Sequence, residues 1–344
     1  MLNTNRNNFQ DDNRIRRRTF LHKSMAASTC VILGCSFEEH NLLAREIEQS
    51  PPNPSLGSSN NMKMGRIGKL SVSRLIVGGN LTSGIAHSRD LIYVSPLLKN
   101  YFTDEKIFET WELSEECGIN SAILRLDDQV IRLTHKYWNE RGGRLQWIAQ
   151  IKPRTMDVEP FRADIKRAID NGAVGAYIQG NVSDCLVKDN RLDLLENALQ
   201  CIKDQGVIAG IGGHSLEVPI ACEKAGLEPD FYLKTLHSRN YWTFNPANDP
   251  WEKFHVSTGK TYDNVWCTEP EETIAFMEKV NRPWIAFKVM AAGAIHPKEA
   301  FQYAYANGAD FICAGMFDFQ VREDSIIASE LLSSQMARSR PWRG

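Results

Sequence analysis

The sequence VIAGIGGHSLEVPIACEKAGLEPDFYLKTLH, residues 207–237, contains two short apolar runs joined by a helical pattern. The first run, residues 207–211, leads through a Gly-rich junction into a helix that we predict from about Leu216. Gly226 ends this helix, as glycine commonly does, and the second run covers residues 231–236. Both runs are almost wholly apolar, which is typical of parallel strands covered by helices. The segment therefore predicts one β-α-β unit.

The same order of elements recurs eight times after Gly65. The apolar runs cover residues 74–77, 121–126, 145–151, 174–178, 207–211, 231–236, 284–289 and 311–314. The helices are predicted to begin near Asp104, Asp128, Glu159, Leu192, Leu216, Glu269, His296 and Asp324.

Strict alternation of strand and helix is compatible with an open doubly wound sheet or with a closed barrel. No GxGxxG follows the first run, where Gly78-Gly79-Asn80 leads into a long polar loop, so the dinucleotide fingerprint of the open fold is absent. Eight units favour closure. We predict an α/β fold, a single-domain (β/α)8 TIM barrel over residues 66–334, followed by a C-terminal tail over residues 335–344.

The first 65 residues have the pattern of an export signal and a spacer. Arg17-Arg18 precede Phe20-Leu21 and an apolar run, an order that resembles the twin-arginine signal, and Ile32-Leu33-Gly34-Cys35 resembles a lipoprotein cleavage box. We predict a signal peptide over residues 1–35 and a disordered linker over residues 36–65. The protein is then exported to the periplasm or cell envelope, with the twin-arginine translocase as its partner.

Lipidation of Cys35 and cleavage without lipid both remain open. A disordered basic tail on a cytoplasmic protein is the alternative to export.

The composition of the whole chain argues against two classes of partner. The 40 Lys and Arg residues are balanced by 42 Asp and Glu residues, a net charge of -2, so the basic excess typical of nucleic-acid binding is absent. No stretch approaches the roughly 20 apolar residues of a membrane span. We expect no nucleic-acid partner, and contact with a membrane only through the signal peptide or a lipid anchor.

Polar residues at the C-terminal ends of the predicted strands are the candidate site, because TIM barrels place their active sites there. They are Asn80, Arg125, Asp127, Lys152, Arg154, Gln179, Asn181, His214, Lys234, His237, Lys288 and Asp318. Four of the cations among them, Arg125, Lys152, Lys234 and Lys288, indicate an anionic substrate or cofactor, or a lysine of lowered pKa. Structural pairing of the individual lysines is the alternative.

His214 and His237 follow adjacent strands. Their imidazoles are candidates for general acid–base work, for two metal ligands or for ordinary hydrogen bonding, and because no HExxH pattern fixes a spacing we predict no metal site. The connection after residue 237 carries Tyr241 and Trp242, which are suited to stacking on sugar rings or, alternatively, to holding the loop on the barrel. We expect a small-molecule, carbohydrate-like substrate.

Several segments resemble the aldo/keto reductase superfamily. They are RIGKLSVSRLIVGGN (66–80), CGIN (117–120), IGGHS (211–215), KVMAAGAIHP (288–297) and AGM (314–316). The resemblance spans the barrel and implies hydride transfer between a nicotinamide cofactor and a carbonyl, carried out by an Asp, a Tyr, a Lys and a His. It also implies a cofactor phosphate held after the last two strands.

The catalytic residues of that family are only partly present. Lys152 matches the family lysine, whereas residues 123–125 and Asp127-Asp128 stand where the Asp and Tyr are expected, and Gln179-Gly180 stand in the place of the His. Without that Tyr, the usual proton donor is absent. The cofactor therefore stays open, with NADP as the one that the resemblance implies.

These observations give one leading hypothesis and two alternatives. We predict an exported enzyme, aldo/keto reductase-like, that acts on a carbohydrate or similar polar small molecule. The alternatives are a nicotinamide-dependent oxidoreductase with a rearranged proton donor, such as His237 or Tyr241, and a catalytically inactive sugar-binding or scaffold barrel.

Each role has its candidate residues. The catalytic candidates are Lys152, His214, His237 and Arg125. The substrate-binding candidates are Asn80, Asp127, Gln179, Lys234, Tyr241, Trp242 and Lys288. The cofactor-binding candidates are Gly293, Gly315 and Arg322.

Overall fold

The computed structural model describes residues 62–85, 91–242, 244 and 266–344. These residues belong to one compact unit, residues 59–344. The predicted signal peptide with Cys35, and most of the predicted linker, lie outside the described residues.

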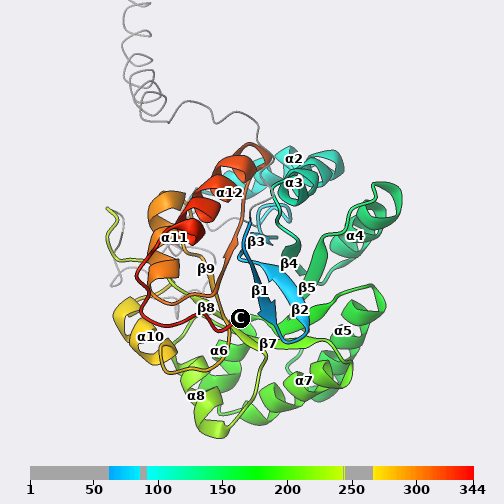
Figure 1. Cartoon of the computed structure of the whole chain (residues 1–344). Coiled ribbons are helices and arrows are strands. Elements are labelled where there is room, and N and C mark those ends of the chain that lie inside the picture. Colours follow the sequence, from blue (N-terminus) through cyan, green and yellow to red (C-terminus); the bar gives the residue numbers. More distant parts are fainter. Residues whose placement is uncertain (1–61, 86–90, 243, 245–265) are drawn as a thin grey trace, which may run out of the picture. The chain divides into compact units, whose positions relative to one another are not determined.

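Eight parallel strands close into a barrel, which confirms the predicted fold (Figure 1). They are β3 (Leu75–Gly78), β4 (Ser121–Arg125), β5 (Gln146–Ile151), β6 (Gly175–Ile178), β7 (Ile208–Gly213), β8 (Phe231–Thr235), β9 (Trp284–Phe287) and β10 (Phe311–Ala314). The ring runs β10-β3-β4-β5-β6-β7-β8-β9, and the pairing of Ile76 with Cys313 closes it.

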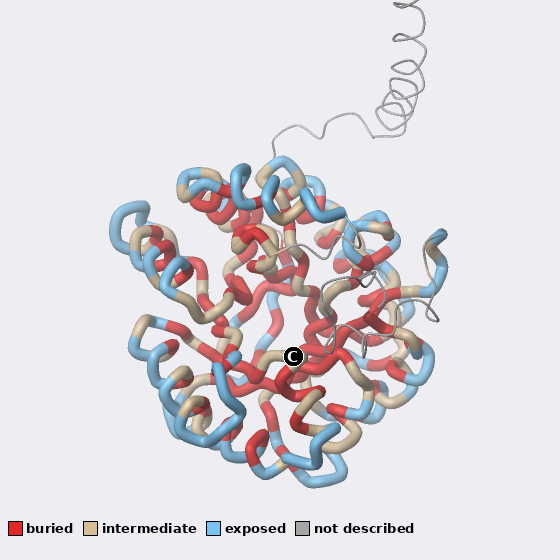
Figure 2. The backbone as a smooth tube through the Cα atoms, turned by 180° about the vertical axis from the view of Figure 1, so that it is seen from behind, coloured by how far each residue is buried: buried red, intermediate tan, exposed pale blue. Residues whose placement is uncertain are grey.

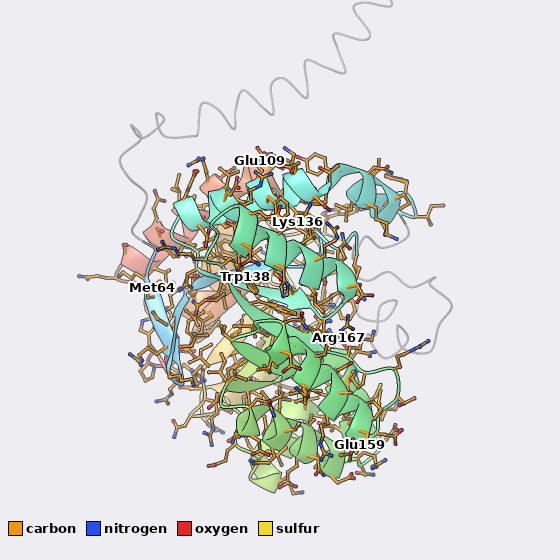
Figure 3. The ribbon with its side chains drawn as sticks, turned by 90° about the vertical axis from the view of Figure 1, so that its right-hand side faces the viewer. Met64, Glu109, Lys136, Trp138, Glu159 and Arg167 are labelled. Carbon is orange, nitrogen blue, oxygen red and sulfur yellow. The ribbon has the colours of Figure 1, made fainter. Side chains whose placement is uncertain are left out.

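One helix of each unit covers the outside of the barrel. These helices are α3 (Asp104–Glu116), α4 (Asp128–Glu140), α5 (Val158–Asp170), α7 (Leu192–Asp204), α8 (Glu217–Ala225), α10 (Pro270–Met277), α11 (Pro297–Ala306) and α12 (Asp318–Ser333). Side-chain caps fix some starts: the Thr103 hydroxyl accepts from the backbone N–H of Lys106, and the Asp127 carboxylate accepts from that of Val130. Figure 3 shows charged residues along the outer faces of α3, α4 and α5.

Three features were not predicted from the sequence. An antiparallel hairpin, β1 (Met64–Ile67) and β2 (Leu70–Ser73), precedes the barrel, and two short helices, α2 (Val94–Tyr101) and α6 (Gly180–Lys188), follow β3 and β6. The predicted start of the last helix near Asp324 is wrong. That helix begins at Asp318, because the Gln320 side chain accepts a hydrogen bond from the backbone N–H of Phe317 and so caps an earlier turn.

Apolar side chains form two layers, one inside the barrel and one between the barrel and its helices. Figure 2 shows the buried strands in the middle and exposed backbone around the outside. Ile67 and Val72 of the hairpin belong to the inner layer, together with Ile148 and Ile208 of the barrel. The hairpin therefore plugs the end of the barrel at which the strands begin.

The C-terminal segment packs against the same end. Arg340 donates from Nη2 to Asp310 Oδ2 at 2.6 Å, and both side chains are almost fully buried. The guanidinium of Arg74 stacks on the rings of Phe311 and Trp342. Described residues therefore close this end of the barrel, and the C-terminal ends of the strands remain as the route for a ligand.

Candidate active site

A cavity of about 620 Å³ lies at the C-terminal ends of the strands. Its cationic lining residues are Arg125 at the end of β4, Lys152 after β5 and Lys288 after β9. His214 follows β7 in the same wall. Among the described residues the lining includes no Asp or Glu. The cavity is therefore positively charged and suited to an anionic ligand.

His214 is paired with a carboxylate that the sequence analysis missed. Its Nδ1 lies 2.7 Å from Oδ2 of Asp184, and Asp184 also accepts the backbone N–H groups of His214 and Ser215, each at 3.0 Å. The Asp184 side chain is fully buried. Since an ionised carboxylate can only accept hydrogen bonds, Nδ1 carries the proton. The Nε2 atom is then the basic nitrogen of the ring, which is the arrangement of a general base held by a carboxylate.

Close packing of α6 on β7 brings this pair together. A Cβ atom on Gly180, the first residue of α6, would lie 2.9 Å from Cε1 of His214. A Cβ atom on Gly212 in β7 would lie 2.8 Å from the backbone nitrogen of Gly180. Glycine at both positions lets the helix approach the strand, so that Asp184, one turn further along α6, reaches the His214 ring.

Trp266 and Lys288 form the neighbouring wall. The Trp266 ring centroid lies 4.9 Å from that of His214, and the Lys288 ammonium lies 2.9 Å from the indole centroid. Lys288, Ala291 and Ala292 all have left-handed backbone conformations, with φ values of 57°, 47° and 57°. Such conformations are strained for residues with a Cβ and are typical of functional sites. The strained turn fixes Lys288 at the end of β9.

His237 lies outside the cavity lining and holds Trp266 in place. Its Nε2 accepts the backbone N–H groups of Trp266 and Cys267, both at 2.9 Å, and its Nδ1 donates to the carbonyl of Ser238 at 3.0 Å. Burial lowers the pKa of His237 to about 4, so the ring is neutral at pH 7. His237 is therefore a positioning residue.

Lys234 is also absent from the lining. It is buried, its Nζ donates to the Thr235 hydroxyl at 2.9 Å, and burial lowers its pKa. The Thr235 hydroxyl in turn lies 2.9 Å from the Trp266 carbonyl. Lys234 is thus part of the support behind the wall formed by Trp266.

The remaining predicted substrate-binding residues divide between the cavity and the surface. Asn80 and Gln179 line the cavity. Asp127 caps α4 and lies 3.7 Å from Nε of Arg125. Tyr241 packs edge-on against the His237 ring, and Trp242 is 88% exposed. The structure does not bring these last three residues to the cavity.

Two amide side chains in the lining have buried oxygens. Gln179 Oε1 and Asn181 Oδ1 have no hydrogen-bond partner among the described residues. Buried polar atoms are normally satisfied, so a site that leaves two acceptors open is suited to a ligand with hydroxyl or amino donors.

Tyr177, on β6, is a cavity residue that the sequence analysis did not single out, because it lies within an apolar run. Its hydroxyl donates to Gln150 Oε1 at 2.9 Å, and both residues line the cavity. Burial raises the pKa of Tyr177 well above its ordinary value. The phenol is therefore neutral and keeps its proton.

The residues predicted to hold a nicotinamide cofactor fit that group poorly. Gly293 and Gly315 line the cavity, but Arg322 lies outside it and pairs with Glu116 at 2.6 Å. The first turn of α12, where the resemblance places the cofactor phosphate, carries Asp318, whose carboxylate accepts from Lys106 Nζ at 2.9 Å. A carboxylate at a helix N-terminus competes with phosphate for the same positive end of the helix dipole.

The described part of the chain holds no group of three His, Cys, Asp or Glu side chains arranged to bind a metal ion. None of its helices is long and apolar enough to cross a membrane.

Comparisons with known proteins support the fold. No family model and no curated protein sequence matches the chain. A solved structure described as a "putative aldo-keto reductase" from Pseudomonas aeruginosa is 15% identical, with a TM-score of 0.52 over 79% of this chain and 94% of that chain. A second one from the same organism is 14% identical, with a TM-score of 0.55 over 80% and 98%. The chain shares its barrel with these proteins.

Proposed function

We propose that this protein is an exported enzyme, aldo/keto reductase-like in fold, that carries out cofactor-independent acid–base chemistry on a small anionic carbohydrate. One observation carries the proposal: a buried Asp184–His214 pair on the wall of a cavity with three cations. A histidine held by a carboxylate in this way is a common form of general base.

The reaction class follows from the charges around this base. Removal of a proton from a carbon next to a carbonyl or carboxylate by His214 Nε2 leaves an enediolate, whose negative charge needs stabilisation. Arg125, Lys152 and Lys288 supply positive charge in the same cavity. Return of this proton from His214 to the neighbouring carbon, with transfer of the hydroxyl proton from one enediolate oxygen to the other, would complete an isomerisation. Its transfer to a β-hydroxyl, which then leaves as water, would complete a dehydration.

The amide oxygens of Gln179 and Asn181 favour a sugar as the source of the reacting group. They are buried acceptors, and the hydroxyl groups of a carbohydrate are donors. A sugar acid or keto sugar would satisfy both the cations and the amides.

Nicotinamide-dependent reduction is the second candidate, because the neutral Tyr177 hydroxyl lies in the cavity and could donate a proton to a carbonyl. NADP would supply the hydride when bound. Tyr177 replaces His237 and Tyr241 as the candidate donor, since neither of those side chains lines the cavity. The carboxylate of Asp318 and the surface position of Arg322 oppose this function.

Export to the periplasm or cell envelope is supported by the order of Arg17-Arg18, the apolar run and Cys35. Replacing Arg17 and Arg18 by Lys should retain the protein in the cytoplasm, measured by cell fractionation. Labelling with a radioactive fatty acid, compared with a Cys35→Ser variant, distinguishes a lipid anchor from plain cleavage.

The catalytic proposal is tested by exchange with solvent deuterium. The full-length protein, incubated in D2O with a panel of sugar acids and keto sugars, should incorporate deuterium at the carbon next to the carbonyl, measured by NMR. His214→Asn should lower the exchange rate at least about a hundredfold, since general base catalysis contributes roughly 10²–10⁴-fold. His135→Asn, at an exposed histidine on α4, is the matched control.

Three results would count against the catalytic proposal. One is deuterium exchange that persists unchanged in His214→Asn. Another is saturable binding of NADPH at micromolar concentration together with hydride transfer, which favours the oxidoreductase. The third is ligand binding without exchange or hydride transfer in any member of the panel, which would indicate an inactive sugar-binding barrel.

A further inference from the structure

The lining of the cavity changes in character around the barrel. Side chains from the segments after β4, β5, β6 and β7 are mostly charged or polar, with Arg125, Lys152, Gln179 and His214 among them. Side chains from the segments after β9, β10 and β3 are mostly apolar. They include Met290, Phe317, Leu81, Ile85, Leu91 and Val94.

These segments are contiguous in the closed ring. β9, β10 and β3 are neighbours, and so are β4 to β7. The apolar side chains therefore form one arc of the cavity and the polar ones another. Asn80, Lys288 and Gln320 are the polar residues that the apolar arc includes.

The apolar arc is only partly buried, although Leu81, Val94, Met290 and Phe317 also pack against the core. Leu81, Ile85, Val94 and Phe317 are half-buried, and Leu91 is 37% exposed. Transfer of such surface from water to an apolar ligand is favourable, at roughly 25 cal/mol for each Å² covered. A ligand without an apolar group would leave the apolar surface of this arc in contact with water.

Helix α2 is fixed against the barrel by its own contacts. Leu98 is buried, and Phe102 at the end of the helix stacks on Phe317 with ring centroids 5.3 Å apart. The Ser95 hydroxyl donates to the carbonyl of Gly84. Leu91 and Val94 therefore reach the cavity from an anchored segment, whereas Leu97 on the same helix is 59% exposed and does not line it.

We propose that this arc is a subsite for an alkyl or aryl substituent carried by the anionic sugar. The substrate class is then a sugar acid linked to an apolar group. The sugar-acid part of this substrate rests on the proposed function. A cavity of about 620 Å³ is within the range of roughly 300–1,000 Å³ that holds drug-sized ligands. The polar arc, with Arg125 and Lys152, binds the anionic sugar, and the apolar arc binds the substituent.

Calorimetric titration of the full-length protein with matched pairs of ligands tests the subsite. The pairs are methyl and hexyl glucuronide, methyl and hexyl glucoside, and acetate and heptanoate. Hexyl glucuronide should bind at least about tenfold more tightly than methyl glucuronide, a gain that burial of two methylene groups already provides. Val94→Ser and Leu91→Ser should reduce this ratio to near one, and Leu97→Ser should leave it unchanged.

The subsite is overturned if the longer member of each pair binds no more tightly than the shorter one, or if the ratio survives in both Val94→Ser and Leu91→Ser. Thermal unfolding of each variant shows whether it is folded.

A different result bears on the proposed function alone. If heptanoate and hexyl glucoside bind as tightly as hexyl glucuronide, and the ratios depend on Val94, the apolar subsite stands and recognition of an anionic sugar fails.

Discussion

At the scale of single residues, the site depends on a glycine as much as on charged groups. Gly180 begins α6 and lies against the His214 ring. A methyl group there would come 2.9 Å from Cε1 of His214 and force the ring or the helix to move. The geometry of the His214–Asp184 pair is therefore set by a residue that makes no chemical contribution.

Gly180→Ala should lower the deuterium exchange rate at least about tenfold, because displacement of a catalytic group by a fraction of an ångström already costs rate. The melting temperature should fall by only a few degrees. Lys188→Ala, at the exposed end of the same helix, is the control and should change neither quantity. An unchanged exchange rate in Gly180→Ala would show that the ring position is not limiting.

His237 makes the stability of the protein depend on pH. Its pKa is about 4 in the folded protein, below the usual 6.5. As the pH falls, this histidine is therefore protonated in the unfolded chain at a higher pH than in the folded protein. Its stabilising contribution is complete above pH 6.5 and is lost as the pH falls from 6.5 to 4. The loss is on the order of 3 kcal/mol, from 1.36 kcal/mol per pKa unit.

Urea unfolding of the protein across this pH range measures that loss. His237→Gln should flatten the profile between pH 6.5 and 4, because a glutamine oxygen accepts the Trp266 and Cys267 N–H groups without titrating. His135→Gln, at an exposed histidine on α4, should keep the original slope. Equal slopes for all three proteins would remove His237 as the cause.

At the scale of elements, α12 carries a buried acid whose ionisation is unfavourable. Asp324 is 2% exposed, its Oδ2 has no hydrogen-bond partner among the described residues, and burial raises its pKa to about 7. The folded protein therefore holds a proton that the unfolded chain releases near pH 4. The associated stability is complete below pH 3.8 and is lost as the pH rises through 7.

Asp324→Asn should stabilise the protein at pH 8, by about 1–3 kcal/mol, because the amide of similar shape has no charge to bury. At pH 5, where Asp324 is protonated in the folded state, the same substitution should have little effect. Thermal unfolding at the two pH values measures the difference. An equal change in melting temperature at both would mean that ionisation of Asp324 is not the cause.

The elements that the sequence predicted are those with a local signal. The eight barrel strands are continuous apolar runs, and most helices start within one or two residues of the predicted position. The hairpin β1–β2 and the helices α2 and α6 were missed because they are short and lie within segments that read as loops. Their positions depend on distant partners, such as Phe317 for α2 and β7 for α6.

In the candidate site, too, the residues that were predicted are those with a local signal in the sequence. Strand-end positions placed Arg125, Lys152, Gln179, His214 and Lys288 at one cavity, because the end of a strand is visible in the sequence. Asp184 was missed, since it reaches His214 only through the packing of α6 on β7. His237 and Lys234 were expected in the cavity, but both side chains lie behind the cavity wall. The direction of a side chain at a strand end depends on the packing of the whole barrel, which the local sequence does not show.

At the scale of the whole molecule, the barrel has two ends with separate tasks. The hairpin and the C-terminal segment close the end at which the strands begin, where Arg74, Asp310 and Arg340 pack together. The other end carries the cavity and the strained turn at Lys288. Substitutions at the first end should affect stability, and those at the second should affect binding and turnover.

The seam between β3 and β10 joins residue 76 to residue 313, so the barrel is closed by the last of its strands to be made. While the ribosome is still adding residues, the growing sheet has two unpaired borders, β3 and β9, and each can pair with a strand of another chain. The sheet is exposed in this way until β10 emerges. A stop codon before residue 311 therefore produces an open sheet with two unpaired edge strands that can associate with other chains, and not a smaller enzyme.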